Sequence, residues 1–299
     1  MTTPRTGSSP APPPDHPSQR ADASVLTVPT GPSVARAVPR QPGERRAPLL
    51  KAMRLIEWMT DAEQPSYGVR EIAQALGIPP STAHRLLSML EEADVVEVEE
   101  ASGRYQFSLQ YYRLACRLAA TQYPFKQVAI AGCRDLADDT GESVYLGLYD
   151  PRARTFMYVE SFESRNPVNY VMAKYEKHPL YPGAGGLSIL PFLPIDEQEE
   201  ILGGLSLEKI TDRTITDLTQ IRSDLREIRE QGYVISIGRR IIGGAGVGAP
   251  LYGPDGRIFG TVVIALPEQR FLQHDAHELG RKVAAAANAI SSQVRMDGQ

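Results

Sequence analysis

The segment from Gly68 to Leu90, GVREIAQALGIPPSTAHRLLSML, constrains the fold more than any other part of the sequence. Apolar residues recur at helical spacing up to Gly77, a residue type that commonly ends a helix. The Pro-Pro pair that follows cannot continue this helix but suits the entry to a second one, where the hydroxyl of Ser81 or Thr82 is a candidate cap. Two short helices joined by a tight turn predict a helix-turn-helix.

The second helix of this pair has two chemically different faces. One is an apolar stripe, formed by Ala83, Leu86, Leu87 and Leu90. The other is small and polar, formed by Thr82, His84, Arg85 and Ser88. A helix in the DNA major groove presents side chains of this kind to bases and phosphates. On this segment alone, an ordinary helical hairpin inside a larger core remains the alternative.

The flanking segments favour the DNA-binding interpretation. Residues 49–62 form an amphipathic helical pattern. Its expected apolar stripe is Leu50, Met53, Ile56 (or Leu55) and Met59. Residues 95–98 and 104–109 predict two short strands joined at Gly103. Three helices followed by such a hairpin make a winged helix-turn-helix, which is much more specific than two helices alone.

Beyond a helical connector at 110–123 and a further helix at 125–140, the pattern changes to alternating apolar residues. Strands are predicted at 143–149, 154–162, 167–175, 233–237, 247–252 and 258–266, the first three pairing antiparallel. Helices are predicted near 185–193, 195–202, 217–231 and 276–294. This order predicts an α+β sensor-type domain with an antiparallel sheet of about six strands.

Composition sets the remaining limits. A chain of 299 residues with a net charge of −4 fits two domains and requires any DNA binding to use a local patch. Residues 1–46 hold ten prolines and a charge of +3, so we expect a disordered leader and consider a weak electrostatic role toward DNA. We expect Cys116 and Cys133 to be buried or half-buried thiols in a reducing cytoplasm, the location also indicated by the lack of a signal peptide or membrane-length apolar run.

Several motifs in order resemble the IclR family of bacterial transcriptional regulators over residues 48–295. They include IAQALGIPPSTAHRLLSML, SGRYQFSLQ, LADDTGESVYLGLYD, YVESFES, TDRTIT, IREQGYVIS and APLYGPDGRIFGTVVIALP. The resemblance implies a winged helix-turn-helix at 47–109, a linker helix at 110–124 and a GAF-like effector-binding and oligomerisation domain at 125–299. It also implies a homodimer or dimer of dimers on a palindromic DNA operator. We expect a repressor controlled by a small metabolite, with a ligand-independent regulator whose second domain only oligomerises as the alternative.

The polar helix face supplies the candidate DNA contacts. They are Ser81, Thr82, His84, Arg85 and Ser88, with Arg104 on the wing. Arg85 is the strongest candidate for recognition of guanine or phosphate. The family usually has a basic residue where Pro80 stands, and residues 47–108 carry five Lys and Arg against ten Asp and Glu. DNA binding by this module should therefore depend heavily on Arg85.

Alignment with the family's motifs predicts the effector pocket. Its expected lining residues are Ala184, Gly185, Ile237, Gly246, Val263 and Ala265, with Tyr170 and Met172 as additional candidates. Positions at which the family usually has polar or reactive residues are apolar here, such as Leu187 and Gly246. Because an apolar wall leaves the oxygens of a small keto-acid unpaired at a cost of about 1–3 kcal/mol each, we expect a larger apolar or aromatic ligand. Simple core filling without a ligand is the competing interpretation.

Other functions find little support in the sequence. The glycine-rich run 243–248 precedes a strand and not a helix, so close sheet packing explains it better than a dinucleotide loop. His274 and His277 lack a third ligand group, and a solvated helix start is the better interpretation. With no catalytic constellation, we expect no enzyme activity, metal or cofactor.

Overall fold

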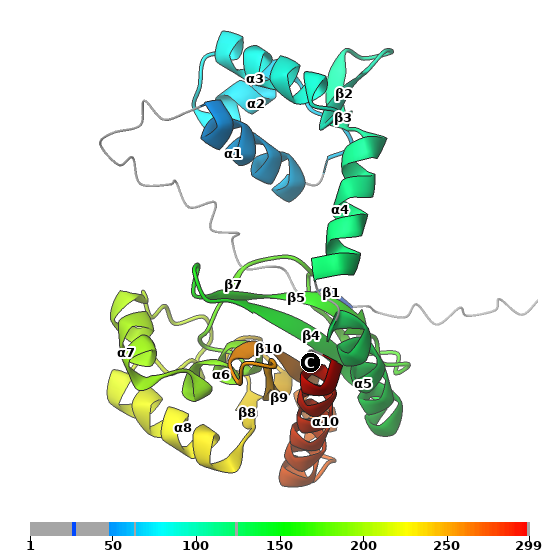
Figure 1. The fold of residues 1–299 in the computed structure, drawn as a ribbon. Helices are drawn as coiled ribbons and strands as arrows, with labels where there is room; N and C mark the ends of the chain where they lie inside the picture. Colours follow the sequence, from blue (N-terminus) through cyan, green and yellow to red (C-terminus); the bar gives the residue numbers. More distant parts are fainter. Residues whose placement is uncertain (1–25, 28–47, 63, 123–124, 298–299) are drawn as a thin grey trace, which may run out of the picture. The chain divides into compact units, whose positions relative to one another are not determined.

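In the computed structural model, residues 26–27, 48–62, 64–122 and 125–297 are described. The chain divides into two compact units, residues 30–129 and residues 1–29 together with 130–299, so that the division falls within helix α5. The described residues of the first unit are called the N-terminal unit, and those of the second are called the C-terminal unit (Figure 1). None of the described helices is long and apolar enough to cross a membrane.

The N-terminal unit is a three-helix core with a β-hairpin. Its elements are α1 (Pro48–Asp61), α2 (Val69–Leu76), α3 (Pro80–Glu92), β2 (Val96–Glu99), β3 (Arg104–Phe107) and α4 (Leu109–Gln122). The strands β2 and β3 pair antiparallel, and Gly103 in the turn adopts a φ of 66°, which favours glycine. This is the winged helix-turn-helix that the sequence predicts.

Helix α3 buries the stripe expected from its sequence. Ala83, Leu86, Leu87 and Leu90 are its buried residues. Gly77 ends α2 in the left-handed conformation. The expected cap was wrong: α3 begins at Pro80 after Pro79, no side chain caps it, and the Pro79 carbonyl accepts from the Thr82 and Ala83 amides. The prolines preset the entry, and the two hydroxyls therefore lie within the first turn.

The stripe expected for α1 was wrong in its first half. Leu55, Ile56 and Met59 are buried together with Ala52, but Leu50 and Met53 are 50% and 45% exposed. Both choices of stripe obey helical spacing, and the helix rotation is decided by the fit against α2 and α3. As a result α1 presents an exposed apolar surface at its N-terminal end. Helix α4 presents another, because Leu109, Tyr112, Leu114 and Leu118 are all at least 49% exposed.

The C-terminal unit is built on one six-stranded antiparallel sheet of order β7-β5-β4-β10-β9-β8. The strands are β4 (Ser143–Asp150), β5 (Thr155–Phe162), β7 (His178–Pro179), β8 (Val234–Ile237), β9 (Gly244–Tyr252) and β10 (Ile258–Pro267). The helices are α5 (Phe125–Thr140), α6 (Ala184–Leu187), the 3-10 helix η1 (Leu190–Phe192), α7 (Ile195–Gly204), α8 (Leu218–Gln231), α9 (Glu268–Phe271) and α10 (Ala276–Asp297). The α+β architecture and five of the six strands were predicted, and β7 was not.

Helices lie against both faces of this sheet. Helix α10 packs on β9, with α5 beside it, where Gly132 faces Ile290. Helices α6, α7 and α8 share the opposite core with η1 and β5, as Figure 1 shows. Central strands covered on both sides are apolar at nearly every position, and β10 is buried from Gly260 to Leu266.

The strand expected at 167–175 was wrong. Only β6 (Tyr170–Val171) forms there, and it pairs in parallel with β1 (Leu26–Thr27) and not with β5. The edge position beside β5 is taken by β7. Asn166-Pro167 and the left-handed Tyr175 interrupt the extended run. Apart from Leu26 and Thr27, the proline-rich leader predicted as disordered lies outside the described residues.

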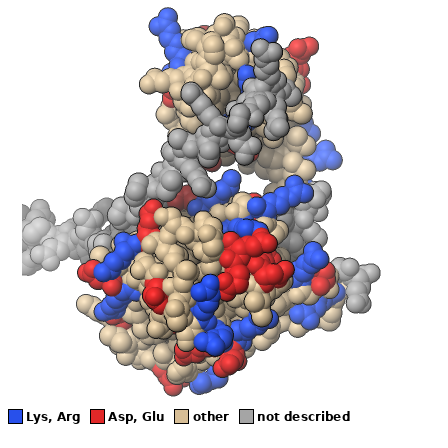
Figure 2. All heavy atoms as spheres, turned by 90° about the vertical axis from the view of Figure 1, so that its left-hand side faces the viewer, with Lys and Arg blue, Asp and Glu red and all other residues tan. Residues whose placement is uncertain are grey.

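The two cysteines differ in their surroundings. Cys133 is buried, and this burial raises the pKa of its thiol to about 12. Cys116 is exposed on α4, so the expectation that both thiols are at least half-buried was wrong. On the face of the molecule drawn in Figure 2, Lys and Arg are interspersed with Asp and Glu over the C-terminal unit.

Candidate functional site

The polar face of α3 is available for contact with a partner. Ser81, His84, Arg85 and Ser88 are exposed, and Thr82 is half-buried. Arg85 is the only Lys or Arg within α3. The face combines one cation with short hydrogen-bonding groups, as a helix that enters the major groove requires.

The wing residue Arg104 is held by contacts inside its own unit. Its Nη2 donates to Glu71 Oε2 at 2.9 Å and to the Ser66 carbonyl at 2.8 Å, and its Nε donates to Ser66 Oγ at 3.2 Å. A hydrogen bond from the Gly68 amide, assisted by Arg104, lowers the pKa of the Glu71 carboxyl. Arg104 thus joins the wing to α2, and a phosphate would have to share its guanidinium with Glu71.

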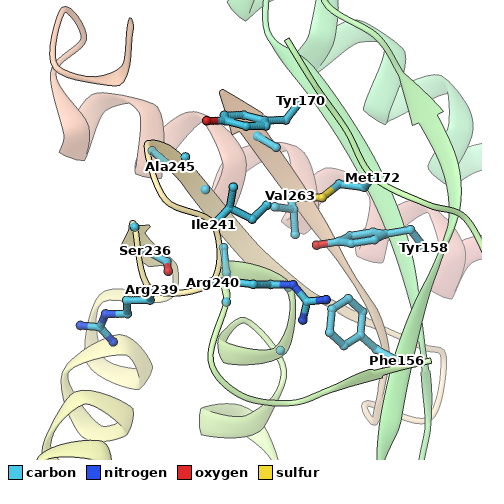
Figure 3. A pocket seen from close by; sticks show the side chains of 18 of the residues that line it. Phe156, Tyr158, Tyr170, Met172, Ser236, Arg239, Arg240, Ile241, Ala245 and Val263 are labelled. Carbon is cyan, nitrogen blue, oxygen red and sulfur yellow. The ribbon is translucent and has the colours of Figure 1, made fainter. Parts of the chain in front are cut away.

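A cavity that is partly open to solvent lies between α6, the sheet and the loop that joins β8 to β9. Its walls include the rings of Phe156, Tyr158 and Tyr170 and the side chains of Met172 and Val263 (Figure 3). The absence of a side chain at Gly185 allows the two rings to approach, because a Cβ there would lie 2.5 Å from Phe156 and 2.6 Å from the Tyr158 hydroxyl. A concave, mostly apolar lining with a few polar groups is typical of small-molecule sites.

The structure brings seven of the eight predicted effector residues together around this cavity. They are Tyr170, Met172, Ala184, Gly185, Gly246, Val263 and Ala265. Ile237 does not line it, whereas Ser236 and Gly238 do. Successive residues of β8 point to opposite faces, so choosing Ser236 or Ile237 required the register of the strand.

Sequence reasoning missed the aromatic wall and one cation. Phe156 and Tyr158 are two residues apart on β5, so they share a face, a signal that was available in the sequence. The missed cation is Arg240, whose side chain extends toward Phe156 and Tyr158, whereas the neighbouring Arg239 points away from them (Figure 3). Arg239 pairs with Asp224 at 2.7 Å. Nothing in the sequence separates these adjacent arginines.

Buried His178 lies beside this aromatic wall. Its Nδ1 lies 3.0 Å from Arg240 Nη2, and its ring packs against Phe156 and Tyr158. Burial, with the adjacent Arg240 charge, lowers the pKa of His178 to about 4. The imidazole is therefore neutral at pH 7, and its Nδ1 accepts the hydrogen bond from Arg240.

We expect His178 to make the C-terminal unit lose stability in mild acid. Its pKa is lower in the folded protein than the unfolded value of about 6.5, so protonation favours unfolding. The contribution of neutral His178 to the free energy of unfolding is complete above about pH 6.5. It is lost as the pH falls toward 4, at up to about 1.4 kcal/mol per pH unit. Denaturant unfolding of wild type and His178→Gln measures this, since other titrating groups cancel in the difference. A difference that does not change with pH contradicts the assignment.

Two further predictions concern glycines and histidines. Residues 243–248 lie at and within the start of β9, where a Cβ at Gly246 would lie 2.8 Å from that of Ala184, so close packing explains the run. The start of α10 is capped, because Asp275 Oδ1 accepts hydrogen bonds from the amides of His277 and Glu278. Nδ1 of His277 lies 2.9 Å from the Tyr233 hydroxyl. Among the described residues, no group of three or more His, Cys, Asp or Glu is placed to hold a metal ion.

A winged helix-turn-helix joined in one chain to an α+β unit with a mostly apolar cavity defines a two-domain transcriptional regulator. Comparison with known families agrees: residues 48–100 match the IclR helix-turn-helix domain, and residues 118–292 match the bacterial transcriptional regulator IclR C-terminal domain. The chain belongs to the IclR family, whose members are regulators and not enzymes.

Individual proteins extend the comparison to most of the chain. The HTH-type transcriptional regulator KipR of Bacillus subtilis is 29% identical over 246 residues, which cover 82% of this chain and 96% of KipR. The crystal structure of Thermotoga maritima IclR has a TM-score of 0.65 at 26% identity, covering 83% of this chain and 98% of that one. An IclR homologue from Microbacterium hydrocarbonoxydans, complexed with 4-hydroxybenzoate, has a TM-score of 0.72 at 19% identity. The match covers 84% of this chain and 100% of that one. This last likeness concerns the fold alone.

Proposed function

We propose that this protein is a sequence-specific repressor whose DNA affinity is set by a small apolar or aromatic metabolite bound in the C-terminal cavity. The observation that carries the proposal is the aromatic wall of Phe156, Tyr158 and Tyr170 around a partly open cavity in the C-terminal unit. The seven predicted lining residues at this cavity are proposed as effector contacts. The fold shared with the 4-hydroxybenzoate complex supports a cyclic ligand of similar size.

For DNA, we propose direct recognition by the exposed face of α3. Arg85 is the proposed base or phosphate contact, with His84 and Ser88 beside it, and Ser81 and Thr82 face the phosphates at the helix entry. Arg104 is kept as a flanking phosphate contact, weakened by its bonds to Glu71 and Ser66.

We further propose a homodimer, or a dimer of dimers, on a palindromic operator. The exposed apolar surfaces of α1 and α4 support self-association, because contiguous apolar surface of this kind marks interaction sites. Two-fold symmetry of the protein matches a palindrome. Repression is favoured over activation because occupying an operator is sufficient to block transcription, whereas activation requires a further surface for the polymerase.

The test begins with an operator, obtained by mapping the genomic sites that the protein occupies. Release of the purified full-length protein from that DNA is then measured with a panel of monocyclic aromatic compounds and with pyruvate and glyoxylate, alongside thermal unfolding. We expect an aromatic compound to give the larger increase in melting temperature and to change DNA affinity. A larger effect of the keto-acids contradicts the proposed ligand class.

The alternative is a ligand-independent regulator whose C-terminal domain only oligomerises. The exposed apolar residues of α1 and α4 lie in the N-terminal unit, so they do not favour this alternative, and the cavity in the C-terminal unit favours the ligand-controlled function. A ligand-independent regulator would bind the operator with an affinity that no compound of the panel alters. The same titrations therefore separate the two functions.

A further inference from the structure

Arg240 is a cation without an acidic partner among the described residues, in a mostly apolar cavity whose lining also includes Ser236 and the Asp224-paired Arg239. The Arg240 stem passes over Gly183, where a Cβ would lie 3.0 Å from Arg240 Cδ, and its guanidinium lies near Phe156 and Tyr158 (Figure 3). The Arg240 guanidinium donates a hydrogen bond to Nδ1 of the neutral His178 ring. No carboxylate of the described residues lies within 4 Å of it. Because a half-buried guanidinium is stabilised by a carboxylate, this one is prepared for an anion from outside.

A second donor points into the same space. The Tyr158 side chain is 5% exposed and lines the cavity, and none of the hydrogen bonds among the described residues is made by its hydroxyl. The hydroxyl is directed into the cavity on the side of Arg240 (Figure 3). Burial raises the pKa of Tyr158 to about 12, so it remains a donor at neutral pH. Because the hydroxyl faces the cavity, an acceptor on a ligand can take its hydrogen bond.

The backbone around Arg240 is fixed from outside the cavity. The hydroxyls of Thr211 and Thr214 donate to the carbonyls of Gly238 and Arg239, each at 2.6 Å. Arg239 is held on the outer side by Asp224. These contacts determine which of the two adjacent arginines turns inward, so the cation is positioned before any ligand arrives.

We propose that Arg240 and the Tyr158 hydroxyl together bind the carboxylate of an aromatic acid, whose ring occupies the space between Met172, Val263 and Tyr170. This inference rests on the proposed function of the cavity as an effector site and narrows the ligand to an anion. It agrees with the expectation that a small keto-acid fits poorly, since the remainder of the cavity is mostly apolar. Arg240 and Tyr158 are thus the specificity-determining residues of the cavity.

The experiment compares acids with neutral compounds of nearly the same shape. Equilibrium binding of benzoate and 4-hydroxybenzoate to the full-length protein is measured beside binding of benzamide and 4-hydroxybenzamide. We expect each acid to bind at least about tenfold more tightly than its amide. In Arg240→Gln this preference should fall to about onefold, with affinity for the amides unchanged, and in Tyr158→Phe it should fall part of the way.

The matched control is Arg239→Gln, which removes the same charge one residue away but on the outer side of the loop. It should keep the acid preference, and Arg240→Lys should restore part of it. Melting temperatures of all variants show whether the fold is retained, and the acid-to-amide comparison in wild type does not depend on any variant folding.

The possible results separate the two proposals. Equal binding of acids and amides to wild type, or an acid preference that survives in Arg240→Gln, overturns the anion anchor and leaves an aromatic effector in place. If no member of either pair binds, the aromatic effector proposal falls, and the anchor with it.

Discussion

Replacing Arg85 by alanine is expected to abolish measurable operator binding while leaving the melting temperature and oligomeric state unchanged. Arg85 is exposed and is the only Lys or Arg of α3, in a module with twice as many acidic as basic residues. Loss of one bidentate base contact costs about 1–3 kcal/mol, which is about five- to 150-fold per half-site, and the proposed dimer would lose it twice. Electrophoretic mobility shift or fluorescence anisotropy with the mapped operator measures the effect.

Arg70→Ala is the matched control for this experiment. Arg70 is also exposed, but it lies on α2, and its removal changes the charge of the module by the same amount. If net charge alone determined affinity, the two variants would weaken binding equally. Wild-type affinity of Arg85→Ala would remove α3 from the proposed interface.

The second large effect is expected from Gly186→Ala. Gly186 lies in α6, and a Cβ there would lie 2.3 Å from the backbone carbon of Leu180, which cannot move aside as the end of a side chain can. Overpacking of a rigid core costs about 1–3 kcal/mol and at times more. Because α6 forms one wall of the cavity, we expect lower stability of the C-terminal unit together with loss of effector binding.

Gly203→Ala serves as its control. Gly203 also lies in a helix, α7, but a Cβ there meets nothing within 4 Å, so this exchange should be neutral or slightly stabilising. Thermal and denaturant unfolding should be followed for separate transitions, since two units need not unfold together. Wild-type stability of Gly186→Ala would mean that α6 can shift away from Leu180 without cost.

The DNA-binding half was the more predictable part of the fold. In α3 every large apolar residue but Met89 falls on one stripe, so the helix has only one orientation that buries Leu86, Leu87 and Leu90. Helix α1 is apolar over a wider arc, and helical spacing alone could not tell Leu50 and Met53 from Ala52 and Leu55. Local pattern determines a helix, and its rotation is determined only where the apolar arc is narrow.

The cavity of the C-terminal unit was predicted in its small lining residues, whereas Arg240 and Ser236 were missed. Gly185, Gly246 and Ala265 follow from motif positions, because close approach of α6 to the sheet requires small residues there. Arg240 lies in the loop after β8, where neither the two-residue repeat of a strand nor the 3.6-residue repeat of a helix predicts the direction of a side chain. The contacts of Thr211, Thr214 and Asp224, distant in sequence, decide that direction.

The sequence by itself determined the class of this protein, because turn residues and apolar periodicity are local and specify the helix-turn-helix, the wing and the strands of the sheet. Only the tertiary structure decided what the cavity presents to a ligand. The direction of Arg240, the cavity-facing hydroxyl of Tyr158 and the exclusion of Ile237 all depend on strand register and on contacts between residues far apart in the chain. Such contacts leave no periodic signal, since they arise when separate elements pack together.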